Sequence, residues 1–498
     1  MKGRIAVTFE GVSKRFGDHA VLENISCTLT GGRIVAITGR NGSGKSTFLR
    51  LAGHLLRPSE GRVVVEETAL PCPTSLSGGH LTQSGRQVNG LTRDGLRCRI
   101  GLLSPELALS PELTGLENLD FLAGLRGRTL ADDEKAALLQ RVGLAPEDAR
   151  KRARACSTGQ RQRLALAVLI ASSADLWLLD EPGANLDDAG KDVVQREART
   201  AAKRGALVLV ATNDANEAAW ADNVLALGNA PLMQQQAVAG STTTQAPLSE
   251  GGGPLAAGGV AKVGTSSLND FMVEGTSPSS ATIHLLRREL VSALRSRSSL
   301  AVMALFAVTA LLALSMALGG TMLAPAPLSA MLWALLFFAS SMGLGGTFAA
   351  DEASGTLLAL RVYGAGQAVL YGKTAFSFLM LLLLAVVLVP LFFILLDAAC
   401  TAPFLFLAAL VLGLLGLAAA GTLLSALTAG SGDRAAGGLL PVLLLPVILP
   451  VFLPAVSLTQ AALGGREAGL SMLVGMGLYD LLLLVGASLL FDALWYED

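Results

Sequence analysis

The stretch Gly39-Arg40-Asn41-Gly42-Ser43-Gly44-Lys45-Ser46-Thr47 follows the apolar run Ile34-Val35-Ala36-Ile37 and fits the pattern G-x-x-x-x-G-K-[ST] throughout. The apolar run predicts a buried strand, and the glycines predict a turn whose backbone N–H groups surround a phosphate. Lys45 would add a positive charge at the same phosphate oxygens, and the Ser46 hydroxyl would ligate Mg²⁺. A chance glycine-rich turn is the alternative. The stretch favours a nucleoside triphosphate site in an α/β domain.

A second apolar stretch, Leu176-Trp177-Leu178-Leu179-Asp180-Glu181, ends in two carboxylates. Asp180 suits the Mg²⁺ shell and Glu181 suits the polarisation of an attacking water, which are the two roles that phosphoryl transfer requires. A buried strand that merely ends in acidic residues is the alternative. The two stretches together predict an ATPase more strongly than either one does.

Between them, Cys156-Ser157-Thr158-Gly159-Gln160 precedes an expected helix from Leu164 to Ala171. Ser157 and Gly159 would present a hydroxyl and backbone N–H groups to a γ-phosphate at the N-terminus of that helix. With Ala184-Asn185-Leu186-Asp187, these motifs stand in an order and spacing that resembles the ATPase domain of ABC transporters.

The resemblance implies that two ATPase domains pair head to tail, each signature motif completing the other's phosphate site, so one copy per chain implies a partner copy. It also implies that Phe16 stacks on adenine, with a core aromatic as the alternative. The expected cofactors are ATP and Mg²⁺. The expected nucleotide-binding residues are Phe16, Gly39, Asn41, Gly42, Ser43, Gly44, Lys45, Ser46, Thr47, Ser157, Thr158, Gly159, Gln160 and Asp187.

The chain departs from the family pattern at two positions. Asn213 stands where the family has a switch histidine; it can donate a hydrogen bond to a phosphate but has no imidazole. Pro105 stands at the position of the family's Mg²⁺-contacting glutamine, with Glu106 as the nearest polar substitute. We therefore assign Glu181 and Asn213 as catalytic residues, assign Ser46, Asp180 and Glu106 to the metal, and expect slow hydrolysis.

The C-terminal half has a different composition. Its uncharged runs exceed the roughly 20 apolar residues that span a bilayer. They predict six spans, at about Ser299 to Gly319, Pro327 to Ala349, Thr374 to Leu396, Pro403 to Leu427, Leu439 to Ala461 and Ala468 to Phe491. The fold predicted is an α/β P-loop ATPase domain over residues 1–232, a flexible Gly-, Ser- and Thr-rich linker over 233–282, and an all-α six-helix transmembrane domain over 283–498.

Lys and Arg residues cluster before the first span and in the loop after the second, where they include Arg361 and Lys373. The positive-inside rule then places both ends of the membrane half in the cytoplasm. The chain opens without a signal sequence, which predicts a cytoplasmic ATPase domain as well. The segment from Asp351 to Leu357 would face the ATPase, either as a docking element or as a solvated charged turn.

Two features of the spans predict special structure. The fifth span contains Pro441, Pro446, Pro450 and Pro454, so we expect it to be kinked or broken. Asp480 lies near the middle of the sixth span, where a carboxylate is a functional candidate unless it sits at the interface. The five cysteines are scattered and predict free thiols, and the near-neutral charge gives no sign of nucleic acid.

The residues Arg287-Arg288-Glu289-Leu290, Phe348 with Asp351, Gly355-Thr356-Leu357 and Leu440-Pro441 with Pro450 resemble the permease of the bacterial cytochrome c maturation system. The ATPase half, through Ser157-Thr158-Gly159-Gln160 and Glu117-Asn118-Leu119, is similar to the ATPase subunit of that system. The resemblance implies a fusion of the two subunits in the bacterial inner membrane, which handles haem with other maturation proteins and a haem chaperone. A general exporter of lipids or drugs, and a remodelling factor that transports nothing, are the alternatives.

Overall fold

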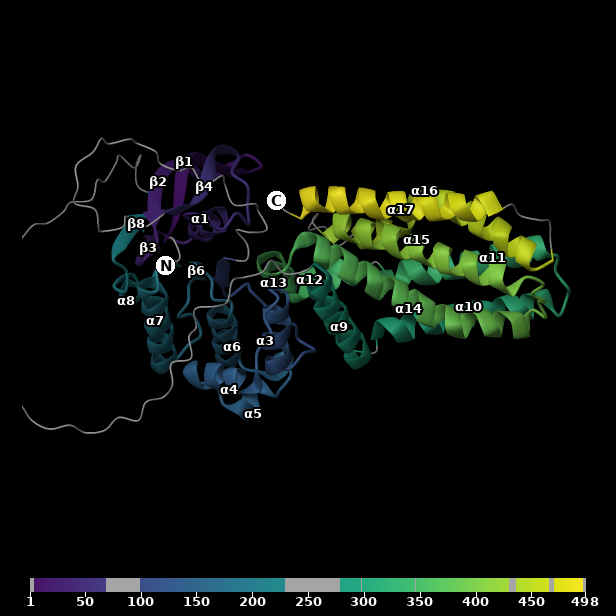
Figure 1. The fold of residues 1–498 in the computed structure, drawn as a ribbon, viewed down its shortest axis with the longest axis horizontal. Coiled ribbons are helices and arrows are strands. Elements are labelled where there is room, and N and C mark those ends of the chain that lie inside the picture. Colours follow the sequence, from purple (N-terminus) through teal and green to yellow (C-terminus); the bar gives the residue numbers. More distant parts are fainter. Residues whose placement is uncertain are drawn as a thin grey trace, which may run out of the picture.

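The computed structural model describes residues 4–68, 99–228, 278–296, 298–344, 346–429, 436–464 and 470–495. Two bodies are visible, an ATPase domain and a long helix bundle, which meet at α9 (Pro278–Ser296), α12 (Gly346–Ser354) and α13 (Thr356–Tyr363) (Figure 1). The predicted fold, an α/β ATPase domain followed by an all-α membrane domain, is confirmed. Residues 69–98, which include Cys72 and Cys98, lie outside the described residues.

The ATPase domain contains two sheets. An antiparallel sheet has the order β2-β1-β4, formed by β1 (Arg4–Phe16), β2 (His19–Thr30) and β4 (Glu60–Thr68). A parallel sheet has the order β5-β6-β7-β3-β8. Its strands are β3 (Arg33–Thr38), β5 (Ile100–Leu103), β6 (Leu176–Asp180), β7 (Leu207–Ala211) and β8 (Asn223–Ala226). Strands β5, β6 and β7 are buried at every residue, which is why they read as continuous apolar runs.

Helices surround the parallel sheet and form a separate unit between β5 and β6. The phosphate loop leads into α1 (Lys45–Ala52), while α7 (Asp188–Lys203) and α8 (Ala215–Ala218) follow β6 and β7. The separate unit contains α3 (Gly115–Gly124), α4 (Asp132–Arg141), α5 (Pro146–Ala149), the 3-10 turn η1 (Ala153–Ala155) and α6 (Thr158–Ala171). Helix α3 of this unit contacts α9 and α13 of the membrane half.

The membrane half begins with α9 (Pro278–Ser296), so the last five residues assigned to the linker, 278–282, belong to a helix. Proline suits the first helical turn because its missing N–H has no partner there in any case. The other helices are α10 (Ser298–Leu318), α11 (Pro325–Leu344), α12 (Gly346–Ser354), α13 (Thr356–Tyr363), α14 (Gly366–Leu395), α15 (Pro403–Ala429), α16 (Ala436–Ala462) and α17 (Leu470–Leu494). Six helical segments of the described chain are long and apolar enough to cross a membrane, as predicted.

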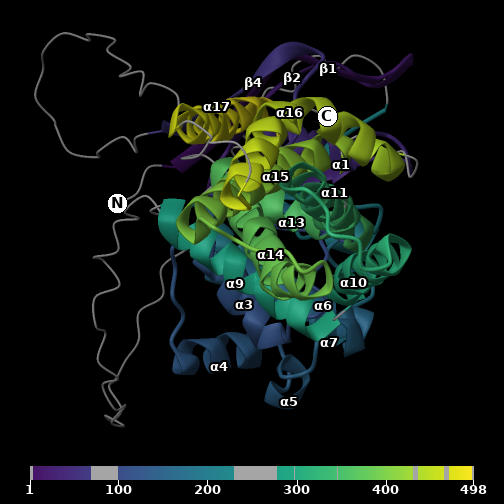
Figure 2. The ribbon, with the colours of Figure 1, turned by 90° about the vertical axis from the view of Figure 1, so that its right-hand side faces the viewer.

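Helix α15 occupies the middle of the bundle, between α11, α14, α16 and α17 (Figure 2). Small residues allow this close packing: a Cβ on Gly413 would lie 2.0 Å from the Trp333 ring. The Trp333 indole donates a hydrogen bond to Thr459 at 2.9 Å, which ties α11 to α16.

The fifth span was expected to be kinked or broken, and the second alternative is wrong, because α16 is one helix from Ala436 to Ala462. Pro446, Pro450 and Pro454 are four residues apart, so they share one side of the helix, and the first two are exposed on the outer surface. Tyr479 of α17 also donates a hydrogen bond to the Val447 carbonyl, at 2.7 Å. This bond ties α17 to α16.

The third span was also misplaced at its start, since α14 begins at Gly366 and includes Lys373. Lys373 is 0% exposed and forms ion pairs with Asp351 and Glu289, so its charge is neutralised inside the protein. A search for uncharged runs that ends a membrane span at every lysine cannot detect such pairing.

Candidate functional site: an ATPase centre docked on a membrane bundle

The phosphate loop leaves β3 and turns into α1 through glycines. Gly44 has a φ of +89°, and a Cβ there would lie 2.9 Å from both Val21 and Leu22 side chains. Only glycine fits that position, which explains the fixed spacing before Lys45. Within the described residues, the Ser43 hydroxyl is buried without a hydrogen-bond partner. An orphaned donor beside turned glycines fits a loop built to receive phosphate oxygens.

Lys45 is buried beneath this loop. Its ammonium donates hydrogen bonds to the carbonyls of Gly39, at 2.9 Å, and Arg40, at 3.1 Å. The positive charge is therefore held where the phosphates of a nucleotide would lie. Thr47 occupies the first turn of α1, beside Ser46.

Asp180 ends strand β6 and is 8% exposed. Burial raises the pKa of its carboxyl group, and a hydrogen bond with Ser46 opposes that rise. A buried carboxylate beside a hydroxyl is a hard oxygen donor pair, which fits Mg²⁺. The described residues contain no group of three or more His, Cys, Asp or Glu side chains placed to hold a metal ion.

Glu181 follows Asp180 with a φ of +45°, an uncommon conformation for a residue other than glycine. Its N–H donates a hydrogen bond to the Ala211 carbonyl at 2.8 Å, while the residue itself stays exposed. Glu217 accepts a hydrogen bond from the Gly183 N–H at 2.9 Å, and Gln162 donates one to the Pro182 carbonyl at 3.2 Å. The buried Glu217 and Gln162 thus hold the turn that presents Glu181. Sequence reasoning missed both, because neither belongs to a short motif.

Asn213 and Asn41, which are 172 residues apart, are joined by a hydrogen bond from the Asn213 amide to the Asn41 side-chain oxygen. The switch position therefore contacts the phosphate loop directly. Asp214 caps the short helix α8 behind it by accepting from the Asn216 N–H at 2.8 Å.

Glu106 is paired with Arg50 of α1 and is largely exposed. Arg50 lowers the pKa of Asp180 and Glu106 raises it, so all three side chains share one electrostatic neighbourhood. The assignment of Glu106 to the metal stays a prediction. In this structure the carboxylate of Glu106 is engaged by arginine.

The signature motif opens α6. Ser157 accepts a hydrogen bond from the Gln160 N–H at 3.2 Å, and the Gln160 side chain accepts one from the Ser157 N–H at 2.9 Å. This capping box leaves the first turn, with Thr158 and Gly159, at the surface. A Cβ on Gly159 would lie 3.1 Å from the Asn185 carbonyl, so the signature adjoins the 184–187 turn.

Asp187 is engaged in contacts within the ATPase domain, whereas the ring of Phe16 is exposed. Asp187 caps α7 through the Gly190 N–H at 3.0 Å and pairs with Arg163 at 2.5 Å, so its contact with nucleotide stays a prediction. Phe16 is 48% exposed and Lys14 lies 4.9 Å from its ring centre. The alternative that Phe16 is a core aromatic is therefore wrong, and the ring is open for stacking.

The segment from Asp351 to Leu357 docks on the ATPase, and the solvated-turn alternative is wrong. It forms the end of α12, a left-handed turn at Gly355 and the start of α13. A Cβ on Gly355 would lie 3.2 Å from the Ala108 Cβ. The Tyr363 hydroxyl donates to the Leu102 carbonyl at 3.5 Å, and Arg126 lies 4.5 Å above the Tyr363 ring.

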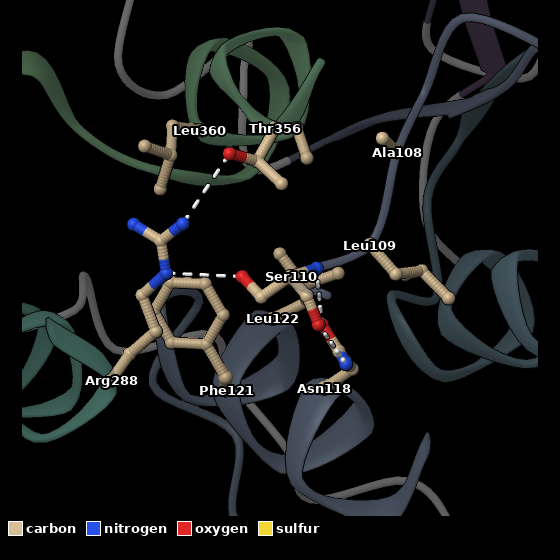
Figure 3. A pocket seen from close by; sticks show the side chains of 10 residues that line it. Ala108, Leu109, Ser110, Asn118, Phe121, Leu122, Arg288, Thr356 and Leu360 are labelled. Carbon is tan, nitrogen blue, oxygen red and sulfur yellow. Dashed lines mark hydrogen bonds between the residues drawn. The ribbon is translucent and has the colours of Figure 1, made fainter. Parts of the chain in front are cut away.

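A buried cluster of four charges supports this docking segment. Arg288 lies 3.2 Å from Asp351 and 2.8 Å from Glu289, and Lys373 lies 2.6 Å and 3.0 Å from the same two carboxylates. Two positive and two negative side chains balance, which is the condition under which buried charges are tolerated. The cluster joins α9, α12 and α14 at the end of the bundle that meets the ATPase. Figure 3 shows Arg288 reaching Ser110 and Thr356 across this junction.

The end of α17 returns to the same place. The ring centre of Trp495 lies 6.3 Å from the ring centre of Phe348 and 5.8 Å from the guanidinium carbon of Arg361. Both ends of the membrane half therefore lie on the ATPase side, which agrees with an even number of spans.

Asp480 lies in the middle of α17 and of its apolar stretch, Leu470–Phe491. It is 2% exposed, and neither carboxylate oxygen has a hydrogen-bond partner among the described residues. Its Oδ1 packs against the backbone of Gly416, where a Cβ would lie 2.6 Å away.

Comparisons with known proteins agree with this architecture. Residues 22–184 match the family described as ABC transporter, and residues 280–489 match the family described as CcmB protein. The chain belongs to the ABC transporter family. More particularly, it joins an ABC ATPase domain to a CcmB-type permease domain in one polypeptide, which makes it a multi-pass membrane protein.

Among its relatives is the cytochrome c biogenesis ATP-binding export protein CcmA of Agrobacterium fabrum, 33% identical over 42% of this chain and 88% of the relative. The lipoprotein-releasing system ATP-binding protein LolD of Shewanella denitrificans is also 33% identical, over 46% of this chain and 95% of the relative. The daunorubicin resistance ATP-binding protein DrrA3 of Streptomyces coeruleorubidus is 34% identical, over 43% and 62%. A solved dimeric ATP-binding cassette, MJ0796 bound to ADP and phosphate, is 28% identical, with a TM-score of 0.37 over 44% of this chain and 94% of that chain.

Proposed function

We propose that this protein is an ATP-driven transporter of the cytochrome c biogenesis haem-handling system in the bacterial inner membrane. The main support for the proposal is that a CcmB-type helix bundle contacts the ATPase domain through α9 and α13. A relative named for cytochrome c biogenesis supports the same system.

ATP would be held by the phosphate loop and Lys45, with Mg²⁺ on Ser46 and Asp180. Bound Mg²⁺ would neutralise charge on the transferred phosphoryl group. Glu181 would polarise the attacking water, and Asn213 would donate a hydrogen bond to the γ-phosphate after leaving Asn41. Two chains would pair so that each signature, Ser157 to Gln160, closes the other's site, with both ATPase domains in the cytoplasm.

ATP hydrolysis would drive either haem export or release of a haem-loaded chaperone from a partner membrane protein. Residues 298–498 contain no histidine and a single cysteine, Cys400, so side chains of this half offer no bis-histidine haem site. His284 lies outside the spans, where its ring packs against Gly124 of α3. This favours release of the chaperone over passage of haem through the bundle.

A gene deletion tests the proposal. We expect loss of holo-cytochrome c with normal haem synthesis, restored by the wild-type gene but not by a Glu181→Gln variant. Normal holo-cytochrome c in the deletion strain would overturn the proposal and favour a general exporter. ATP-dependent haem uptake into sealed inverted vesicles would assign haem export, whereas intact maturation without uptake would assign chaperone release.

A further inference from the structure

We infer that residues 110–115 transmit the position of permease helix α9 to the signature motif, with Glu112 as the positioning residue. The inference rests on the ATPase activity and on contacts within the described chain, not on the haem-related function. It concerns a route between the two halves that does not pass through position 105, where proline replaces the expected glutamine.

Helix α9 binds the 110–115 segment at Ser110 and Glu112 and also binds Glu117 just beyond it. Arg288 Nε donates to the Ser110 hydroxyl at 3.0 Å, within the buried junction of Figure 3. Arg295 donates to the Glu112 carbonyl at 2.8 Å and binds both oxygens of Glu117 at 2.6 and 2.8 Å. Because these are charge-assisted bonds, they fix the segment to α9 more firmly than neutral ones would.

Asn118 of α3 makes the segment rigid from inside the ATPase. It is fully buried, accepts from the Ser110 N–H at 2.8 Å and donates to the Ser110 carbonyl at 3.1 Å. The same amide donates to the Thr114 carbonyl at 3.0 Å. A segment pinned at Ser110 and Thr114 moves as one piece.

The other edge of the segment is bound to the residues that lead into the signature. The Glu112 carboxylate pairs with Arg154 at 2.8 Å and with Arg152 at 3.5 Å. Backbone bonds add to this: the Ala153 N–H donates to the Leu113 carbonyl at 2.8 Å, and the Gly115 N–H donates to the Lys151 carbonyl at 3.2 Å.

Residue 155 is two positions before Ser157, the cap of α6. A displacement of α9 must therefore either break this set of hydrogen bonds or carry the first turn of α6 with it. The first turn of α6 is the part of the signature motif that would contact a γ-phosphate bound by the partner copy. Glu112 joins the two sides through different atoms, its carbonyl toward Arg295 and its carboxylate toward Arg154.

A double-substitution cycle on the full-length protein in lipid nanodiscs tests the inference. Arg295→Gln and Arg154→Gln remove contacts to opposite sides of Glu112. We expect each to lower the kcat for ATP about fivefold, a typical size for coupling between sites. The KM for ATP should change less than about twofold, because coupling loss leaves the phosphate-loop contacts in place.

The double variant should be no slower than the slower single variant, since both substitutions interrupt one route. As a matched control, Arg141→Gln breaks an ion pair with Glu197 elsewhere in the ATPase. In the double variant Arg141→Gln with Arg295→Gln, the factor by which kcat falls should equal the product of the factors for the two single variants. The inference would be overturned if the fall in kcat of the Arg295→Gln, Arg154→Gln double variant equalled the product of the two single falls. An unchanged kcat in either single variant would overturn it as well.

Conservative variants separate positioning from folding. Arg154→Lys and Arg295→Lys keep the charge, so each should recover at least half of the lost kcat. A KM rise together with a lower unfolding temperature, and no recovery by lysine, would mean that the contacts only stabilise the fold.

Discussion

The side-chain amide of Asn213 donates a hydrogen bond to Asn41 of the phosphate loop. The residue at the switch position is thus held by the loop that it must act upon, through a neutral amide pair. Histidine in place of Asn213 could instead carry a positive charge toward the γ-phosphate. This relationship suggests that hydrolysis is limited by the chemistry available at position 213.

We predict that Asn213→His raises the kcat for ATP by up to about tenfold, the effect of one charge-assisted hydrogen bond worth about 1.5 kcal/mol. Steady-state ATPase assays and nucleotide binding measured separately will check this, and affinity should hardly change. Asn41→Ala serves as the control, because it removes the present partner of Asn213 without adding an imidazole. An unchanged or lower rate in Asn213→His would show that the site has adapted to asparagine.

Glu181→Gln should bind ATP, trap a dimer and lower hydrolysis by about a hundredfold or more, because glutamine cannot polarise the attacking water. Size-exclusion chromatography with ATP and phosphate release report the two effects. Lys45→Ala should instead weaken nucleotide binding, since it removes the charge beneath the phosphates. Normal phosphate release from Glu181→Gln would remove Glu181 from its catalytic role.

Replacing Lys373 with methionine should destabilise the protein by about 3–5 kcal/mol, because Asp351 and Glu289 would keep a buried charge without its partner. The unfolding temperature in detergent measures the loss. Adding Asp351→Asn to Lys373→Met should restore part of it by rebalancing the cluster. Arg62→Gln, which breaks an exposed pair with Glu10, should leave the temperature unchanged. Equal effects of the buried and exposed substitutions would contradict this account.

The Glu117–Arg295 contact should make stability depend on pH below 4.5. Hydrogen bonds from Arg295 lower the pKa of Glu117 from 4.5 to about 2. A carboxylate with a lowered folded pKa stabilises the protein above its unfolded pKa, and that contribution is lost as the pH falls toward the folded value. The wild-type unfolding temperature should therefore fall more steeply below pH 4.5 than that of Glu117→Gln. Identical pH curves would show that the contact is absent in solution.

Expressing residues 1–232 and the remainder as two chains should still give a working complex. The assigned linker lies largely outside the described residues, whereas the contacts of α9 and α13 belong to the described junction. Separation removes an effective concentration in the millimolar range, so assembly should weaken only at low expression. Co-purification and cytochrome c maturation provide the measurements. Failure with both pieces abundant in the membrane would give the linker a structural role.

The sequence by itself determined the ATPase centre and the six spans. Gly39 to Thr47, Asp180 with Glu181, and the uncharged runs are local patterns, because a phosphate loop needs glycine at fixed spacing and a bilayer needs about 20 apolar residues. The tertiary structure decided how the halves meet. Lys373 reads as a span boundary until Asp351, which is 22 residues away, neutralises it inside the protein. Glu112 carries no motif, and only folding brings Arg154 and Arg295 to it from two domains. Such pairs depend on geometry between distant segments, which local spacing does not encode.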